Sequence, residues 1–313
     1  MEEFENKKEE SITCLTVRQI AASVDAFTKN NNIYNTVLIL YGAKYREEEK
    51  EKIKTILKKY SNLIKDEKKD LDLPTNFNFY NCYPTKQLIE AVKSMEFSFS
   101  NTRNILLNGE EGNGTTQLAI WFSEWYIKEY CKKEKYKDYI FYSYCTEQTS
   151  IYDLIGKQKP NDKLDLGKTL IQWEDGFLIK GIKKGGVVIL DNIDKCPTTV
   201  LERLNSLFDK KYDDSSDSNQ NNNNEKINKE KFIVNENPEK KEIDIDSNFR
   251  LICICNIERK KNLSPAFMDR LDNIVLENQI KDLNENEYKD LIKCLLKPIK
   301  KNENEAADNC ANE

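Results

Sequence analysis

A glycine-rich segment, GEEGNGTTQ at residues 109–117, has the residue types of a loop that holds phosphate groups. It follows a short apolar run and precedes a helical pattern, which is the setting in which G-x-x-x-x-G-K-[ST] binds phosphate. Glycines let backbone N–H groups face an anion, and a helix N-terminus adds partial positive charge. Thr116 stands where a hydroxyl would coordinate magnesium, but Thr115 takes the place of the lysine. Taken alone, a glycine-rich turn without that lysine is more often an ordinary strand-to-helix connection.

A second motif favours the phosphate site over the ordinary turn. GVVILDNIDK, residues 186–195, is an apolar strand pattern that ends in Asp191. In P-loop ATPases an acid at this point holds magnesium. The next position normally carries a glutamate that activates the attacking water, but here it is Asn192, and an amide cannot take a proton at neutral pH. The alternative is a buried strand that ends in a solvated aspartate; it is disfavoured because the two motifs follow in the expected order.

Two weaker features complete the set. Residues 251–256, LICICN, form a strand pattern whose last side chain, Asn256, could touch an outer phosphate or the attacking water. Residues 263–271, LSPAFMDRL, place Arg270 near the end of a short helix pattern, from which it could reach the nucleotide of a neighbouring subunit. A lone arginine is usually a surface charge, so the order of all four features is what predicts an ATP and Mg²⁺ site. The expected nucleotide contacts are Gly109, Gly112, Asn113, Gly114, Thr115, Thr116 and Gln117, the expected metal ligands are Thr116 and Asp191, and the expected catalytic positions are Asn192, Asn256 and Arg270.

Five apolar runs alternate with helix patterns and predict a parallel sheet covered on both faces. They lie at residues 105–107, 139–145, 186–190, 251–255 and 274–276. The expected fold class is therefore α/β, a three-layer αβα P-loop core with a parallel sheet. Because open α/β sheets bind ligands at the carboxyl ends of their strands, the glycine-rich loop should lie beside Asp191.

The chain divides into four expected segments. Residues 1–62 have the pattern of a small helical unit, residues 63–80 that of a linker, residues 81–283 that of the core, and residues 284–313 that of a helical start followed by a polar tail. Within the core, residues 209–231 are Asn-rich and almost without apolar side chains. Such a segment cannot offset its ordering entropy by burial, so we expect a disordered surface insertion.

The composition argues against several classes of function. Hydrophobic residues make up 38% and charged residues 33% of the chain, and the net charge of −5 disfavours a general nucleic-acid binder. Histidine is absent, which removes Ser-His catalysis and most zinc sites. The nine cysteines form no CxxC pair and are expected to be free thiols in a reducing, intracellular compartment. No apolar run reaches about 18 residues, and the charged start MEEFENKKEE lacks a signal-peptide core, so neither a membrane span nor a secretory signal is expected.

The sequence resembles one AAA+ module of the dynein-related, midasin-type ATPases over roughly residues 80–290. The likeness is carried by WEDGFLIKGIKKGGVVILDNIDKCPTTVLERLNSLFD, FIVNENPEKKEIDIDSNFRLICICN and LSPAFMDRLDNIVLENQ, and IYDLIG at residues 151–156 fits an insert of that family. Residues 15–27 resemble the start of a helical lid, with Arg18 at the position of a sensor arginine. That lid would belong to a preceding module, so the chain is expected to be a slice of a tandem array.

The resemblance implies a ring-like arrangement of AAA+ modules with Mg-ATP as the ligand class. Its implied partners are neighbouring AAA+ modules and protein clients, with no membrane and no direct nucleic-acid partner. For midasin itself it implies remodelling of pre-ribosomal particles in the nucleus; a relative without that role would work in the cytoplasm.

Thr115 and Asn192 depart from the working pattern of this family and leave three hypotheses. The first is a module that binds ATP, hydrolyses it little or not at all, and has a structural or regulatory role. The second is an active ATPase in which Lys183 or Lys184 supplies the missing charge. The third is a protein-interaction scaffold that binds no nucleotide. The retained glycines, hydroxyl and acid favour the first hypothesis over the third.

Overall fold

The structure of the protein is a computed structural model. It describes residues 73–79, 83–160, 171–208, 230–239, 242–276 and 283–292. The expected lid-like segment with Arg18 lies outside the described residues, as do residues 209–229 of the expected insertion and the tail after residue 292. The segment boundaries predicted for those parts therefore stay predictions.

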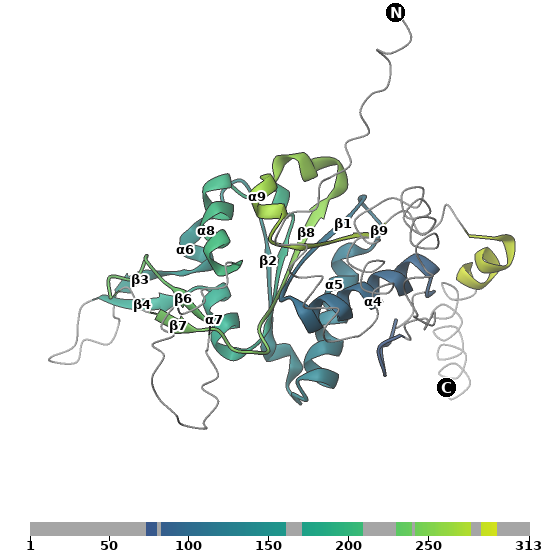
Figure 1. Ribbon diagram of the computed structural model, residues 1–313, viewed down its shortest axis with the longest axis horizontal. Coiled ribbons are helices and arrows are strands. Elements are labelled where there is room, and N and C mark those ends of the chain that lie inside the picture. Colours follow the sequence, from purple (N-terminus) through teal and green to yellow (C-terminus); the bar gives the residue numbers. More distant parts are fainter. Residues whose placement is uncertain are drawn as a thin grey trace, which may run out of the picture.

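A five-stranded parallel sheet forms the centre of the protein (Figure 1). Its strands are β1 (Asn104–Gly109), β2 (Ile140–Tyr144), β5 (Val187–Asp191), β8 (Arg250–Asn256) and β9 (Asp272–Leu276). They lie in the order β2-β5-β8-β1-β9, and each pair of neighbours is parallel. Every strand coincides with one of the predicted apolar runs, so the predicted α/β class with a parallel sheet is confirmed.

The two faces of the sheet carry separate hydrophobic cores. In β5, Val187 and Ile189 pack into one core, whereas Val188 and Leu190 pack into the other. All 5 residues of this strand are buried. Burial on both faces explains why the strands appear in the sequence as continuous apolar runs without polar alternation.

One face is covered by α4 (Lys86–Asn101) and α5 (Thr115–Trp125) (Figure 1). The side chain of Thr85 caps α4 by accepting a hydrogen bond of 3.2 Å from the backbone N–H of Leu88. Between the two helices, Phe99 and Phe122 pack edge to face with ring centroids 5.1 Å apart. α5 continues into a π-helical turn, η3 (Tyr126–Tyr130), so the helix predicted after the glycine-rich loop is present.

The other face is covered by α6 (Ile151–Leu154), α7 (Phe177–Lys184) and α8 (Thr198–Phe208) (Figure 1). α7 approaches the sheet closely, because a Cβ added at Gly181 would lie 2.3 Å from Cγ2 of Val188. The helix ends at Gly185, which adopts a left-handed conformation with φ 65° and ψ 40°. The chain then enters β5, so the end of α7 lies near the amino-terminal edge of the sheet.

Two short antiparallel hairpins lie on the side of α6, α7 and α8 (Figure 1). β3 (Gly156–Pro160) pairs with β4 (Ile171–Asp175), and β6 (Lys231–Ile233) pairs with β7 (Glu242–Asp244). No apolar run predicts either hairpin; β3 is the sequence GKQKP, buried only at its glycine. The second hairpin starts at Lys231, the last residue of the expected insertion.

Short helical turns connect the remaining elements. They are η4 (Tyr136–Tyr139), η5 (Ile193–Lys195), η6 (Ile257–Asn262) and α9 (Pro265–Met268). The cysteines in the described ranges are free thiols, and four of them are buried. None of the helices that the structure describes is long and apolar enough to span a membrane.

Candidate functional site

Most of the predicted functional residues meet at the carboxyl-terminal edge of the sheet. Gly109, the last residue of β1, lies level with Asn256 of β8 and with Leu276 of β9. Asp191 ends β5, which pairs with the other side of β8. Parallel α/β sheets bind their ligands at this edge, so the topology brings the two motifs together as predicted.

The loop between β1 and α5 is held open by two left-handed glycines. Gly112 has φ +87° and Gly114 has φ +79°, a region that residues with a Cβ rarely adopt. A Cβ added at either position would meet no atom within 4 Å, so the space beside these residues is open. Asn113 fastens the loop by donating from Nδ2 to the carbonyl of Leu276 at 3.1 Å. The loop is therefore anchored at its edge and has room beside its backbone.

The first turn of α5 faces this opening. Gly114 is the N-cap residue of the helix and offers no side chain to accept from the first-turn N–H groups. Helix N-termini of this kind bind anions, because free N–H donors and the helix dipole act together. Gln117, in the first turn, is exposed. These features fit the phosphate groups of a nucleotide.

Thr115, at the lysine position, is turned toward the end of β1. A Cβ added at Gly109 would lie 2.5 Å from the Cγ2 methyl of Thr115 and 3.0 Å from the carbonyl oxygen of Leu276. The glycine at 109 is thus required by the close approach of this methyl group. The side chain at 115 provides no cation for an outer phosphate.

The carboxylate of Asp191 accepts three hydrogen bonds. Its Oδ2 accepts from the hydroxyl of Thr116 at 2.9 Å and from the hydroxyl of Tyr142 at 2.7 Å. Its Oδ1 accepts from the backbone N–H of Asn192 at 2.8 Å. Burial, followed by the hydrogen bond to Asp191, raises the pKa of Tyr142, so this phenol stays protonated and donates. Tyr142 was not predicted, because a tyrosine in a strand pattern carries no sign of such a contact.

A hydroxyl beside a carboxylate is a donor set that suits Mg²⁺, which prefers oxygen ligands. Thr116 and Asp191 would hold the ion, and the ion would neutralise charge on the phosphates. Their contact shows that the two predicted metal ligands lie together, and their role stays a prediction.

Asn192 follows in a left-handed conformation, with φ 53° and ψ 47°. Asparagine tolerates this region better than most residues that carry a Cβ. The position expected of a water-activating glutamate therefore holds an amide in a backbone conformation that suits asparagine.

A second network joins the loop to the region after β8. The buried carboxylate of Asp194 accepts from Nε of Arg259 at 2.7 Å and from the backbone N–H of Asn256 at 3.2 Å. Glu111 of the loop accepts from Nδ2 of Asn256 at 3.3 Å and from Nη1 of Arg259 at 3.2 Å. The hydrogen bond to Asp194 raises the pKa of Arg259, which stays cationic. Of these four residues only Asn256 was predicted; the others are single charges that nothing in the sequence marks.

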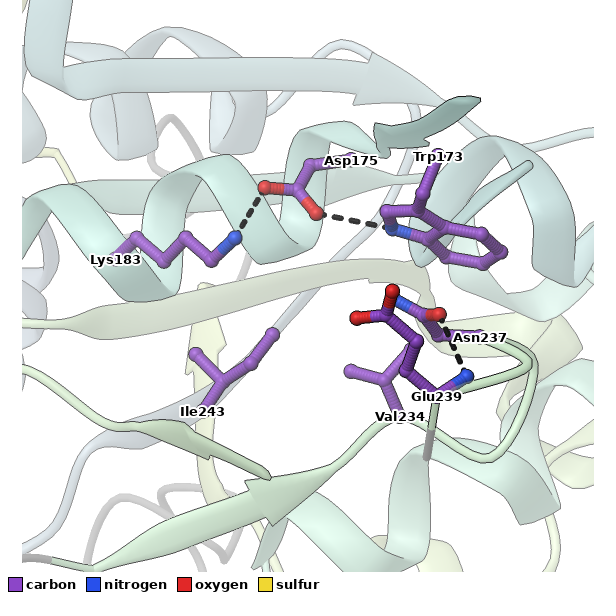
Figure 2. A pocket seen from close by; sticks show the side chains of 7 residues that line it. All are labelled: Trp173, Asp175, Lys183, Val234, Asn237, Glu239 and Ile243. Atoms are coloured by element: carbon purple, nitrogen blue, oxygen red, sulfur yellow. Dashed lines mark hydrogen bonds and ion pairs between the residues drawn. The ribbon is translucent and has the colours of Figure 1, made fainter. Parts of the chain in front are cut away.

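The remaining predicted residues lie apart from this centre. Arg270 follows α9 and donates from Nη1 to the carbonyl of Ala266 at 2.7 Å; its action on a neighbouring subunit stays a prediction. Lys183 lies in the last turn of α7 and is turned toward Asp175, in a pocket also lined by Trp173 (Figure 2). Lys184 donates to the carbonyl of Asp138 at 3.2 Å, just before β2. Both lysines thus lie near the amino-terminal edge of the sheet, away from the loop.

Comparison with known proteins identifies the family. Residues 104–271, more than half of the 313 residues, match the family described as AAA domain (dynein-related subfamily). Midasin of Giardia intestinalis is 31% identical over 139 residues, which are 44% of this chain and 2% of that protein. Midasin of Dictyostelium discoideum is 38% identical over 64 residues, 20% of this chain and 1% of that protein. The chain thus spans a small fraction of the length of these relatives. With a parallel sheet of the order described and a phosphate-type loop at its edge, the chain belongs to the dynein-related subfamily of AAA domains.

Proposed function

We propose that this chain is an AAA+ module that binds Mg-ATP weakly, hydrolyses it little or not at all, and has a structural or regulatory role in a larger ring of modules. The observation that carries the proposal is the contact of 2.9 Å between Thr116 and Asp191 beside an open glycine loop. The two predicted metal ligands are kept. Thr115, however, lacks the positive charge of a lysine, and Asn192 lacks the basic carboxylate of a glutamate. Both losses affect the chemistry and spare the scaffold.

The expected affinity follows from what is lost and what remains. A hydrogen bond to a charged group contributes about 1.5–3 kcal/mol, and each 1.4 kcal/mol is about tenfold in affinity. Absence of the lysine at position 115 therefore predicts binding about 10- to 100-fold weaker than in a module that has it. Backbone donors at the start of α5 and the Thr116 hydroxyl support the binding that remains.

The wider role belongs to the same proposal. The aligned residues are 2% and 1% of the two midasins, so the relatives are very long chains. We infer that neighbouring AAA+ modules and protein clients are the partners of this chain. By its likeness to midasin, pre-ribosomal particles are the proposed clients and the nucleus is the proposed compartment.

A calorimetric titration with Mg-ATP tests the binding. We expect weak binding by the unmodified chain, loss of binding in Asp191→Ala, and tighter binding in Thr115→Lys. Circular dichroism confirms that each variant is folded. Equal affinity for Mg-ATP in Asp191→Ala and the unmodified chain would show that this predicted metal ligand takes no part in the binding.

A second candidate function is a scaffold that binds no nucleotide. The observation that favours it is the pair of exposed carboxylates, Glu110 and Glu111, in the loop that is expected to hold phosphates. In the titration, absence of binding by both the unmodified chain and Thr115→Lys would favour this scaffold.

A further inference from the structure

The side chain of Glu111 makes contacts that its position alone does not explain. It is 76% exposed, yet its carboxylate accepts from Arg259 at 3.2 Å and from Asn256 at 3.3 Å. Long exposed side chains normally remain in water, because holding them in one geometry costs rotamer entropy. Two donors, Asn256 at the end of β8 and Arg259 in η6, therefore form a site for an anion, and a carboxylate of the loop fills it.

The two donors are held in place by a buried acid. Asp194, whose side chain is 0% exposed, accepts from Nε of Arg259 and from the backbone N–H of Asn256. The guanidinium fork of Arg259 presents further N–H groups outward, and one of them reaches Glu111. Two carboxylates thus share one cation, and only the Glu111 carboxylate is exposed to exchange with another anion.

The anion site lies at the position in the fold where the outermost phosphate of a nucleotide is expected. Asn256 lies level with Gly109, where the glycine loop begins. Its strand, β8, lies between β1, which carries the loop, and β5, which carries Asp191. An anion bound to Asn256 and Arg259 would therefore lie at the same sheet edge as the loop N–H groups and the predicted metal ligands. This is where the cation absent at position 115 is needed.

We propose that Arg259 extends the predicted phosphate contact of Asn256 into a site for the outermost phosphate of a nucleoside triphosphate, and that Glu111 occupies this site when the nucleotide is absent. The inference rests on the proposed nucleotide binding and specifies its regulation. Arg259 supplies the positive charge that Thr115 lacks. A triphosphate has to displace a carboxylate of the chain itself, whereas a diphosphate, which lacks the outermost phosphate, does not.

The test compares two loop variants of the full chain that remove the same charge. Glu111→Ala removes the competing carboxylate, and Glu110→Ala is the matched control at the neighbouring exposed position. The ligands are Mg-ADP and a non-hydrolysable ATP analogue with Mg²⁺, both measured by calorimetry. We expect Glu111→Ala to bind the triphosphate analogue about tenfold more tightly than Glu110→Ala, with equal affinity for Mg-ADP.

A second variant assigns the effect to the arginine. Adding Arg259→Gln to Glu111→Ala should abolish the gain for the triphosphate analogue and leave Mg-ADP binding unchanged. An equal gain in Glu110→Ala and Glu111→Ala would reflect only the general charge of the loop and would overturn the inference.

Thr115→Lys separates failure of this inference from failure of the proposed function. If Thr115→Lys binds nucleotide and Glu111→Ala shows no preference for the triphosphate, the inference alone fails. If no variant, including Thr115→Lys, binds either nucleotide, nucleotide binding fails and this inference fails with it.

Discussion

Thr115 and Thr116 are adjacent residues whose side chains serve different parts of the site. The Thr116 hydroxyl donates to Asp191 at 2.9 Å, whereas the Thr115 methyl lies over Gly109 at the end of β1. The pattern of the loop predicts the first contact, since the motif specifies a hydroxyl near the acid. The contacts of Tyr142 and Arg259 could not be predicted, because they join residues far apart in the sequence and no local pattern marks them.

The Tyr142 phenol should make stability depend on pH in the alkaline range. Its pKa is raised above the ordinary value of 10.0 in the folded chain, so the unfolded chain loses this proton first. The contribution to stability is fully present below that ordinary pKa and declines as the pH rises through the folded-state pKa. We expect the free energy of unfolding in urea to fall less steeply above about pH 10 in Tyr142→Phe.

The matched control for this measurement is Tyr144→Phe, on the same strand. The Tyr144 hydroxyl contacts Lys195 at 3.3 Å and does not reach Asp191 through any contact that the structure describes. Because Tyr144→Phe keeps the contact between Tyr142 and Asp191, the fall above about pH 10 that this contact causes should remain in that variant. Equal slopes for Tyr142→Phe and the unmodified chain would contradict the role given to the contact with Asp191.

At the scale of elements, the strands could be predicted and the hairpins could not. β5 and β8 are buried along their whole length, so their sequences carry continuous apolar runs. β3 is buried only at its glycine, β4 has no buried residue, and the two pair with each other, so nothing in their residues requires a strand. The end of α5 could not be predicted either, since the change to the π-helical turn η3 leaves no mark on the helical pattern.

The junction of β1 and α5 gives a test of the fold at the site. In Gly109→Ala the new Cβ would lie 2.5 Å from the Thr115 methyl, and overpacking of this kind costs about 1–3 kcal/mol. Thr115→Ser removes that methyl. We therefore expect the double variant to recover part of the stability lost in Gly109→Ala, measured by urea unfolding as a double-mutant cycle. Additive effects of the two changes would show that the methyl does not cause the constraint.

At the scale of the whole molecule, a long polar segment interrupts a continuous fold. The core resumes with β6, and Glu230 just before it pairs with Arg103 at 2.8 Å and accepts from the backbone N–H of Ile245 at 2.8 Å. Glu230 therefore has a structural role, although it lies inside the range predicted from the sequence as an insertion. The composition of this range could not predict the contacts of Glu230, because they join it to residues far away in the sequence.

Deletion of residues 213–228 should leave the fold intact, because this range has few apolar side chains to bury. We expect the melting temperature to change by less than about 3 °C. A deletion extended through Glu230 is the control and should lower it further, since the contacts to Arg103 and Ile245 are lost. A large loss of thermal stability in the shorter deletion would show that the segment belongs to the fold.

We propose that this module keeps the site for Mg-ATP and has lost its turnover. The most direct test is phosphate release from Mg-ATP by the unmodified chain, by Thr115→Lys with Asn192→Glu, and by each of these with Asp191→Ala. We predict release at background from the unmodified chain, because Thr115 cannot neutralise the transferred phosphoryl group and Asn192 cannot act as a base. Robust release from the unmodified chain, abolished by Asp191→Ala, would contradict the account.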